Sequence, residues 1–241
     1  GLSAADTIDG GDGTDTLTVT NSSAATLTPA FTSIETLVVN TSTGFTLDLT
    51  NATDKTSLTS YTISGTNSAS TDNVVLTNIA SGSTVSVSDD STWDGASTAD
   101  TDNTGDLDKL TIDTVGGGTL TLNVNANEDG ITHTATTLAT LTTITDATTI
   151  TINSKNSDSN NIINDLTALA LDAADTISLT LVAEDSAGLL VGDITLTTGL
   201  QTLSLSSAAG AASTIGVMVD ATALDTLSIT STGASSSATV G

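Results

Sequence analysis

The residues best suited to chemistry lie near the start of the chain, where glycines alternate with aspartates. Gly10, Gly11 and Gly13 precede Asp15, and Thr16-Leu17-Thr18 follows with an apolar residue between two threonines. Glycine permits the tight turn with φ > 0 that directs backbone carbonyl oxygens to one side. Aspartate adds carboxylate oxygens, and calcium takes about six to eight hard oxygen ligands. The stretch therefore predicts a calcium-binding turn that leads into a short strand.

A degenerate copy of the same unit comes directly before it. Gly1 and Gly10 are nine residues apart, and the same spacing separates Asp6 from Asp15 and Ile8 from Leu17. The main predicted calcium site consists of carboxylates and turn glycines: Asp6, Gly10, Gly11, Asp12, Gly13 and Asp15. The alternative is a Gly/Asp turn that binds no metal.

The nonapeptide Gly10–Thr18, G-G-x-G-x-D-x-L-x, resembles the calcium-binding repeats of RTX proteins, which bacteria export by type I secretion. The rest of the chain, rich in Ser, Thr, Ala and Asp, is similar in style to β-strand repeats of bacterial S-layer and S-layer-like RTX proteins. The resemblance implies calcium between consecutive turns, held by Asp6 and Asp15 with backbone from the three glycines. It also implies a protein that is secreted and extracellular or on the cell surface.

The charge balance narrows the range of partners. The 241 residues carry a net charge of −25, with three lysines (Lys55, Lys109 and Lys155) and no arginine. Nucleic acids and anionic membrane surfaces need cationic residues, so both are excluded as partners, whereas calcium is favoured. No run of about 20 apolar residues is present, which predicts that the chain is not inserted in a membrane. Because the sequence starts at Gly1 without an initiator Met, we expect a fragment or a processed piece.

Catalytic groups are scarce. The chain has no cysteine, and its one histidine, His133, stands near Asp129 without a G-x-S-x-G elbow. Zinc would find only carboxylates as ligands. Glycan-cleaving β-helices rely on aromatic and cationic residues, and aromatics make up only 2% of this chain. We therefore expect that the protein is not an enzyme.

Apolar and polar residues alternate in many short stretches, which is typical of half-buried strands. Examples are Thr16–Thr20, Thr46–Thr50, Thr119–Val124, Thr149–Ile152, Ile177–Leu181 and Leu203–Leu205. Threonine occupies most of the outward positions, which suits a β-branched residue. The segment Asn161–Ala174 has spacings near those of a helix, and we interpret it as another strand.

A recurring phrase with an inner leucine gives the chain a degenerate period. Its anchors are Leu17, Leu37, Leu110, Leu203 and Leu227, with Tyr61 and Ile177 in similar positions. Steps of about 20 to 27 residues match one coil of a stacked solenoid. The predicted fold is all-β, a right-handed parallel β-solenoid (β-helix) with irregular coils, and tandem β-sandwiches are the alternative.

The predicted organisation has calcium-binding turns at residues 1–18 and a β-strand-repeat solenoid at 19–241. An acidic loop at 89–108 interrupts the solenoid and is a second candidate calcium site. Its carboxylates are Asp89, Asp90, Asp94, Asp100, Asp102, Asp106 and Asp108. The alternative interpretation is a solvated acidic loop, in which like charges repel one another without a counter-ion.

These observations predict an extracellular, calcium-dependent structural protein that assembles with copies of itself into a surface layer or fibre. One alternative is the repeat region of a large RTX adhesin that binds a host, a glycan or cell-surface polysaccharide. Another is ice binding by Thr-x-Thr pairs on a flat solenoid face. Ice binding requires pairs that are in register on successive coils, and the drifting spacing predicts that they are not.

Overall fold

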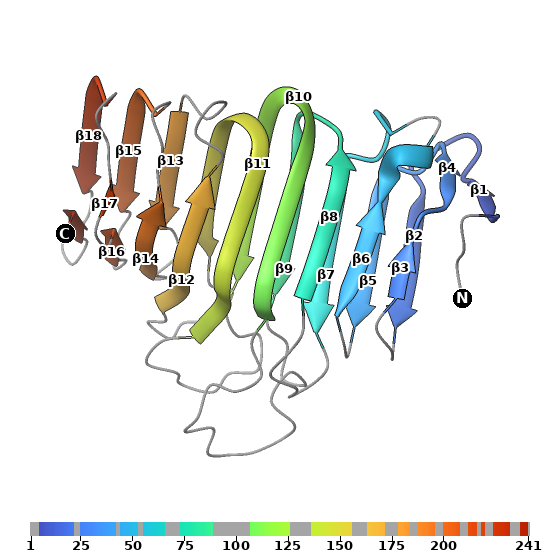
Figure 1. Ribbon diagram of the computed structural model, residues 1–241, viewed down its shortest axis with the longest axis horizontal. Helices are drawn as coiled ribbons and strands as arrows, with labels where there is room; N and C mark the ends of the chain where they lie inside the picture. The colour runs from blue at the N-terminus through green and yellow to red at the C-terminus, as the bar shows by residue number, and fades with distance from the viewer. Residues whose placement is uncertain are drawn as a thin grey trace, which may run out of the picture.

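The computed structural model describes fifteen segments of the chain: 5–21, 25–41, 44–52, 55–65, 73–88, 107–125, 136–155, 163–171, 178–183, 188–195, 200–207, 212–215, 218–219, 224–231 and 237–240. Within these segments every strand pairing is parallel. The strands stack along one axis, with the two termini at opposite ends of the molecule (Figure 1). The predicted parallel β-solenoid is therefore confirmed, and tandem β-sandwiches, which are built from antiparallel sheets, are wrong.

One long face of the solenoid, called here the first face, begins at the blue end of Figure 1 with β2. In stacking order its strands are β2 (Thr16–Asn21), β5 (Thr36–Thr41), β7 (Ser60–Gly65), β9 (Ser83–Ser88), the second halves of β10 (Leu107–Asn125) and β11 (Thr136–Lys155), β13 (Ser178–Ala183), β15 (Thr202–Ser207) and β18 (Thr226–Ser231).

The opposite side, the second face, consists of the strands that complete each coil. They are β3 (Ala25–Leu27), β6 (Phe45–Asp48), β8 (Asn73–Ile79), the first halves of β10 and β11, β12 (Ile163–Leu171), β14 (Gly188–Thr195), β16 (Ala212–Ile215), β17 (Met218–Val219) and β19 (Ser237–Val240). Strand β12 confirms the interpretation of Asn161–Ala174 as a strand. Strands β10 and β11 bend continuously from one face to the other at the top of Figure 1.

The first coils have an additional side near the N-terminus. There β1 (Thr7–Asp9) pairs with β4 (Ala30–Thr32), and the 3₁₀ helix η1 (Leu49–Asn51) follows β6. Asp48 caps this helix, because its Oδ1 accepts hydrogen bonds from the backbone N–H of Thr50 (2.9 Å), the hydroxyl of Thr50 (2.6 Å) and Nδ2 of Asn78 (3.0 Å). In the part of the chain that is described, no helix is long and apolar enough to cross a membrane.

Coil length varies more than predicted. On the first face Thr16 pairs with Thr36, a step of 20 residues, and Thr36 pairs with Ser60, a step of 24. The step from Ser83 to Leu120 takes 37 residues and includes the acidic part of the sequence. The next two steps take 30 and 29 residues, before the length returns to 24 at β13 and β15. Extra residues therefore enter between strands, while the strand pairing stays parallel.

The predicted anchors do not share one position in the coil. Leu17, Leu37 and Tyr61 do form one inward row, which continues to Leu205 and Ile229. Leu203 and Leu227 lie in the adjacent inward row, two residues earlier on their strands. Leu110 pairs with Val74 on the second face. The anchors were wrongly placed in one row because the same sequence phrase occurs in strands of both faces, and the chain passes from one face to the other within each coil.

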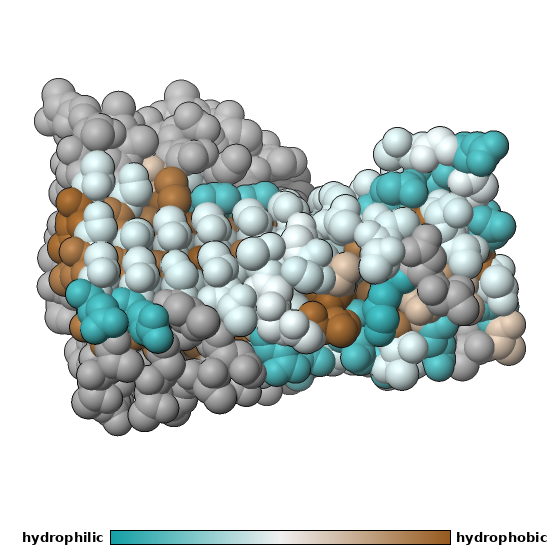
Figure 2. Space-filling view, turned by 90° about the horizontal axis from the view of Figure 1, so that it is seen from above, coloured by the Kyte–Doolittle hydropathy of each residue, from teal (hydrophilic) through white to brown (hydrophobic). Residues whose placement is uncertain are grey.

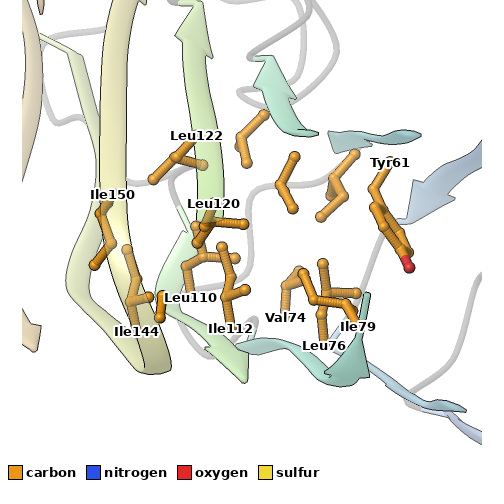
Figure 3. Close-up of a cluster of buried hydrophobic side chains, with 14 of the residues drawn as sticks. Tyr61, Val74, Leu76, Ile79, Leu110, Ile112, Leu120, Leu122, Ile144 and Ile150 are labelled. Carbon is orange, nitrogen blue, oxygen red and sulfur yellow. The ribbon is translucent and has the colours of Figure 1, made fainter. Parts of the chain in front are cut away.

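Aliphatic side chains from the two faces fill the interior. In Figure 3, Leu120, Leu122 and Ile150 of the first face lie opposite Leu110, Ile112 and Ile144 of the second. The row Leu27, Leu47, Leu76, Ile112, Ile144 and Leu171 is buried along its whole length. Burying a Leu or Ile side chain stabilises the fold by roughly 1.5–3 kcal/mol, so these rows provide the main stabilisation of the solenoid.

Candidate functional site

The predicted calcium-binding turn joins β1 to β2. Gly11 and Gly13 have φ values of +82° and +128°, which favour glycine. Gly10 is constrained by packing instead, because a Cβ at this position would collide with the carbonyl oxygen of Ser33 on the next coil. The backbone N–H of Gly11 donates to Oδ1 of Asp9 (3.1 Å). The glycines of the motif thus allow this turn to pack closely against the next coil at Ser33.

Asp15 is the predicted ligand that the structure places best. Its carboxylate lies beside Gly10, and its Oδ2 is buried without a hydrogen-bond partner. A buried carboxylate oxygen without a partner is costly, because it has lost its hydration. The backbone of Asp15 is well held: its N–H donates to Oε2 of Glu35 (2.7 Å), and its carbonyl accepts from the N–H groups of Glu35 and Thr36.

Glu35 is a candidate ligand that the sequence prediction missed. It occupies the position of Asp15 on the following coil, so the two carboxylates come from adjacent strands of one face. The signal was present in the sequence, since Asp15-Thr16-Leu17 and Glu35-Thr36-Leu37 share the order acid, threonine, leucine. Together with the carbonyl of Ser33 near Gly10, these carboxylates offer hard oxygens of the kind that calcium prefers.

The other residues of the main predicted site are less concentrated. Asp6 precedes β1 and is partly buried, and its backbone carbonyl accepts from the N–H of Ala30 (3.1 Å). Asp12 is exposed at the turn. Strands β1 and β2 pair with β4 and β5, not with each other, so the nine-residue repeat does not stack turn on turn. Among the described side chains no group of three or more His, Cys, Asp or Glu is arranged to hold a metal.

The second candidate calcium site lies almost wholly outside the described residues. Six of its carboxylates are outside the described residues: Asp89, Asp90, Asp94, Asp100, Asp102 and Asp106. His133 and Asp129, which were considered as catalytic groups, are also outside the described residues. Asp108 belongs to β10 and not to a loop. The acidic segment therefore ends at Asp106, just before β10 begins at Leu107.

The most regular surface is formed by hydroxyl side chains on the first face. One outward row, called here the main row, contains only threonine and serine on successive strands: Thr16, Thr36, Ser60, Thr84, Thr121, Thr151, Thr180, Ser204 and Ser228. A second row, the flanking row, lies two residues earlier on each strand and contains Thr119, Thr149, Ser178, Thr202 and Thr226. In Figure 2 small pale side chains form rows that run along the molecule toward its C-terminal end.

These rows correct the expectation that the Thr-x-Thr pairs would be out of register. On five successive strands, from Thr119 and Thr121 to Thr226 and Ser228, each pair lies directly beside the next. Variable coil length does not disturb this register, because the extra residues lie between strands. Neither row contains a charged residue, although the whole chain has a net charge of −25.

A shallow pocket of about 260 Å³ lies near the corner between the faces. Lys55, Thr56, Ala80, Ser81 and Val115 line it, and Val115 is 40% exposed. The lining supplies one cation, two hydroxyl groups and no carboxylate.

Comparisons with models of known protein families, with curated proteins and with solved structures gave no match to this chain. The likeness to RTX and S-layer proteins thus rests on the sequence features of Gly10–Thr18 and on composition.

Proposed function

We propose that this chain is a structural β-solenoid of the bacterial cell exterior, which calcium stabilises and which assembles with copies of itself into a layer or fibre. The observation that carries the proposal is the buried Oδ2 of Asp15, which has no hydrogen-bond partner and lies on the coil next to Glu35. A divalent cation at this position would neutralise both carboxylates and replace the lost hydration. Asp15 and Glu35 would hold it, with the carbonyl of Ser33 beside them.

The proposed calcium site in this turn agrees with a location outside the cell. A ligand that binds only the folded state adds free energy to it, by about 2.7 kcal/mol when its concentration is 100 times its Kd. Calcium is scarce inside cells and is commonly millimolar outside, where weak extracellular sites are filled. The excess of carboxylates over lysines makes copies of the chain repel one another. Cations screen this repulsion, so they should favour association as well as folding.

Calcium dependence is tested by thermal unfolding followed by circular dichroism, with calcium or with a chelator. We expect calcium to raise the Tm of the parent chain, and the increase to be mostly lost in Asp15→Asn. The matched control is Asp225→Asn, which removes the same charge from an exposed position just before β18, far from this turn. An equal calcium response in all three proteins, or no response in the parent, would contradict the proposed site.

Assembly is tested separately by electron microscopy and light scattering of the same samples. We expect layers or fibres with calcium and their dissolution by chelator. A chain that stays monomeric at high concentration in calcium would contradict the structural role.

A second function, ice binding, is favoured by the main and flanking rows. Hydroxyl and methyl groups in these rows repeat about 4.8 Å apart between strands and about 6.6 Å apart along a strand. A flat, uncharged and periodic surface of this kind suits a periodic solid ligand such as ice, whose surface oxygens are also regularly spaced. The five-strand region from β10 to β18 is the part where both rows are continuous.

Ice binding is tested by thermal hysteresis and by inhibition of ice recrystallisation. We expect Thr151→Tyr, at the centre of the main row, to abolish any activity of the parent. Thr143→Tyr is the control, because Thr143 lies on the same strand, β11, but on the second face. Absence of activity in the parent would exclude this function and leave the structural proposal unaffected.

A further inference from the structure

The carboxylates of the chain are absent from the strands of one face. The chain contains 28 aspartates and glutamates, and none of them belongs to the nine described first-face strands, where β10 and β11 are counted from Thr119 and Thr149. Lys155, the last residue of β11, is the one charged residue in these strands. The second-face strands, in contrast, contain Asp48, Asp108, Asp113, Asp165 and Asp193. A molecule with a net charge of −25 therefore has one long surface whose strands carry no negative charge.

A third outward row extends the main and flanking rows on this face. It lies two residues after the main row on each strand and contains Thr18, Val38, Thr62, Ser86, Asn123, Asn153, Val182, Ser206 and Thr230. None of the three rows contains a side chain longer than asparagine. Main-row residues such as Thr121 and Thr180 are partly exposed, so solvent reaches this surface. The first face is therefore a broad accessible surface of short, uncharged side chains.

The chemistry of these rows makes the surface complementary to itself. A threonine or serine hydroxyl can both donate and accept a hydrogen bond, whereas a carboxylate can only accept. Two such surfaces placed against each other can therefore satisfy the hydroxyl groups of both. Short side chains also lose less rotamer freedom on burial than lysine or glutamate, which lowers the entropic cost of contact. For a chain with this excess of carboxylates, the first face is the surface on which two copies can meet with the least repulsion.

The size of the surface suits a stable pair. Nine strands about 4.8 Å apart extend over roughly 40 Å, and three outward positions about 6.6 Å apart cover a width of roughly 15–20 Å. The product is about 600–800 Å² on each copy. Specific protein–protein interfaces bury about 800 Å² on each partner, so contact over this face has the area that a stable dimer needs.

We propose that two copies of the chain associate through their first faces, sheet against sheet, about a two-fold axis. This inference rests on the proposed structural function and specifies one surface through which copies associate. The contact is isologous and closes on itself, so it produces a pair, and a layer or fibre grows from such pairs through other surfaces. The hydroxyl rows are buried inside the pair.

The arrangement keeps the carboxylates of the second faces apart. Sheets that pack face to face lie about 10 Å apart, and the first and second faces of one copy lie on opposite sides of its core (Figure 3). The two second faces of a pair are then about 30 Å apart, with both cores and the contact between them. This separation exceeds the screening length of about 8 Å at physiological ionic strength, so repulsion between the second faces is weak.

One added carboxylate on each face tests the contact. Thr121→Glu introduces it in the main row on β10, the central strand of the nine. Thr111→Glu is the control, because it adds the same charge to the same strand but on the second face, between Val75 and Thr143. In sedimentation with calcium we expect Thr121→Glu to weaken pairing by about 100-fold or more, since like charges brought together at an interface are strongly unfavourable. Thr111→Glu should pair like the parent, and circular dichroism confirms that both variants are folded.

A second measurement does not depend on disrupting the contact. Because the chain contains no cysteine, a single engineered cysteine reports on its own accessibility. Ser204→Cys places it in the main row and Thr143→Cys places it on the second face, both at partly exposed positions. We expect the reaction of Ser204→Cys with a maleimide to slow strongly as protein concentration rises, whereas Thr143→Cys keeps its rate at the concentrations where only pairs form.

The outcomes separate this contact from the proposed function. Layers or fibres that persist in Thr121→Glu, with Ser204→Cys fully reactive inside them, would overturn the contact while the structural function stands. Pairs that protect Ser204→Cys but never grow into a layer or fibre would support the contact and overturn the function. A parent chain that stays monomeric and binds ice through Thr151 would assign the first face to ice and overturn both.

Discussion

The phenol of Tyr61 lies within the aliphatic interior of the solenoid. It is 1% exposed, and its hydroxyl donates to the backbone carbonyl of Leu58 (3.1 Å). Burial raises the pKa of Tyr61 well above its usual range, because the phenolate would lose its hydration. The hydroxyl therefore serves to satisfy a buried carbonyl, while the ring fills the first-face row between Leu37 and Val85.

The first prediction concerns alkaline pH. A group whose pKa is raised by folding contributes stability below its unfolded pKa, near 10 for tyrosine, and this stability is lost as pH rises above about 10. Because Tyr61 is the single tyrosine, phenolate absorbance reports on it alone. We expect the phenolate to form only as the protein unfolds, with both signals changing together. A phenolate that forms while circular dichroism is still native would contradict the burial of Tyr61.

Asp48 shows the opposite behaviour at the cap of η1. Hydrogen bonds from the side chain and backbone of Thr50 lower the pKa of Asp48, and the bond from Asn78 acts in the same direction. A carboxylate whose pKa is lowered by folding contributes stability above its unfolded pKa, near 4, and this stability is lost as pH falls through its folded pKa.

The second prediction follows from this cap. We expect Asp48→Ala, which removes the capping oxygen, to destabilise the protein at neutral pH by about 1 kcal/mol, the typical value for a lost N-cap. The difference from the parent should shrink as the pH falls below about 4, where the carboxylate becomes protonated. Urea unfolding of both proteins at several pH values measures this difference. A difference that does not change with pH would show that the charge of Asp48 contributes nothing.

At the scale of the element, each strand has an inward and an outward side of different importance. In β13 the burial alternates strictly, with Leu179 and Leu181 at 0% exposure and the intervening Thr180 facing outward. Leu179 and Leu181 belong to the hydrophobic core cluster, whereas Thr180 lies between Thr151 and Ser204 of the neighbouring strands on the outer side. The loss of stability caused by a mutation should therefore alternate along the strand, large at inward positions and small at outward positions.

The third prediction compares two adjacent residues of β13. We expect Leu179→Ala to cost about 2–5 kcal/mol, as buried leucine-to-alanine changes do when they leave a cavity. Thr180→Ala should change stability by about 0.5 kcal/mol or less, as surface substitutions usually do. Chemical denaturation of the two variants gives both values. Equal costs would mean that β13 does not have one side in the core.

Polar ladders add stabilisation between strands. Nδ2 of Asn153 donates to Oδ1 of Asn123 (2.9 Å), and Nδ2 of Asn123 donates to the hydroxyl of Ser86 (3.2 Å). This chain of side-chain hydrogen bonds crosses the longest steps of the first face, where the coils take 37 and 30 residues. It therefore supports the register at the place where the connecting segments are longest.

At the scale of the whole molecule, a uniform aliphatic core is combined with a strongly negative charge. A net charge of −25 opposes the compact state through self-repulsion, and neither cysteine nor arginine is present to offset it. Exposed charges further apart than about 8 Å are largely screened at physiological ionic strength. The stability of the solenoid should therefore depend on salt even without a specific ion.

The fourth prediction is that sodium chloride raises the Tm of the parent chain in the presence of chelator, with most of the increase complete by about 0.15 M, where screening is already extensive. Calcium should raise the Tm further at the same ionic strength, because the site at Asp15 contributes separately. Magnesium at the same concentration is the control for divalent screening. Identical curves for sodium, magnesium and calcium would show that screening alone accounts for the effect of cations.

Alternation within each strand was sufficient to determine which residues face inward. Thr16–Thr20 and Ile177–Leu181 both predicted strands with one apolar side, and β2 and β13 confirm them, as β12 confirms the interpretation of Asn161–Ala174. The side chains of a strand alternate between faces with a period of two, so a few residues suffice to predict which side is buried. For the same reason the all-β class and the aliphatic core could be predicted from the sequence.

Register could not be predicted, because it depends on residues that are far apart in the chain and on connections of any length. Spacing placed Leu110 in one row with Leu37, whereas the structure places it on the second face. The drifting spacing also wrongly predicted that the Thr-x-Thr pairs of successive coils are out of register. Parallel strands are aligned by their shared core rows and backbone hydrogen bonds, and the surplus residues enter the loops. Only the tertiary structure therefore showed that Glu35 lies beside Asp15 and that threonine and serine form continuous rows.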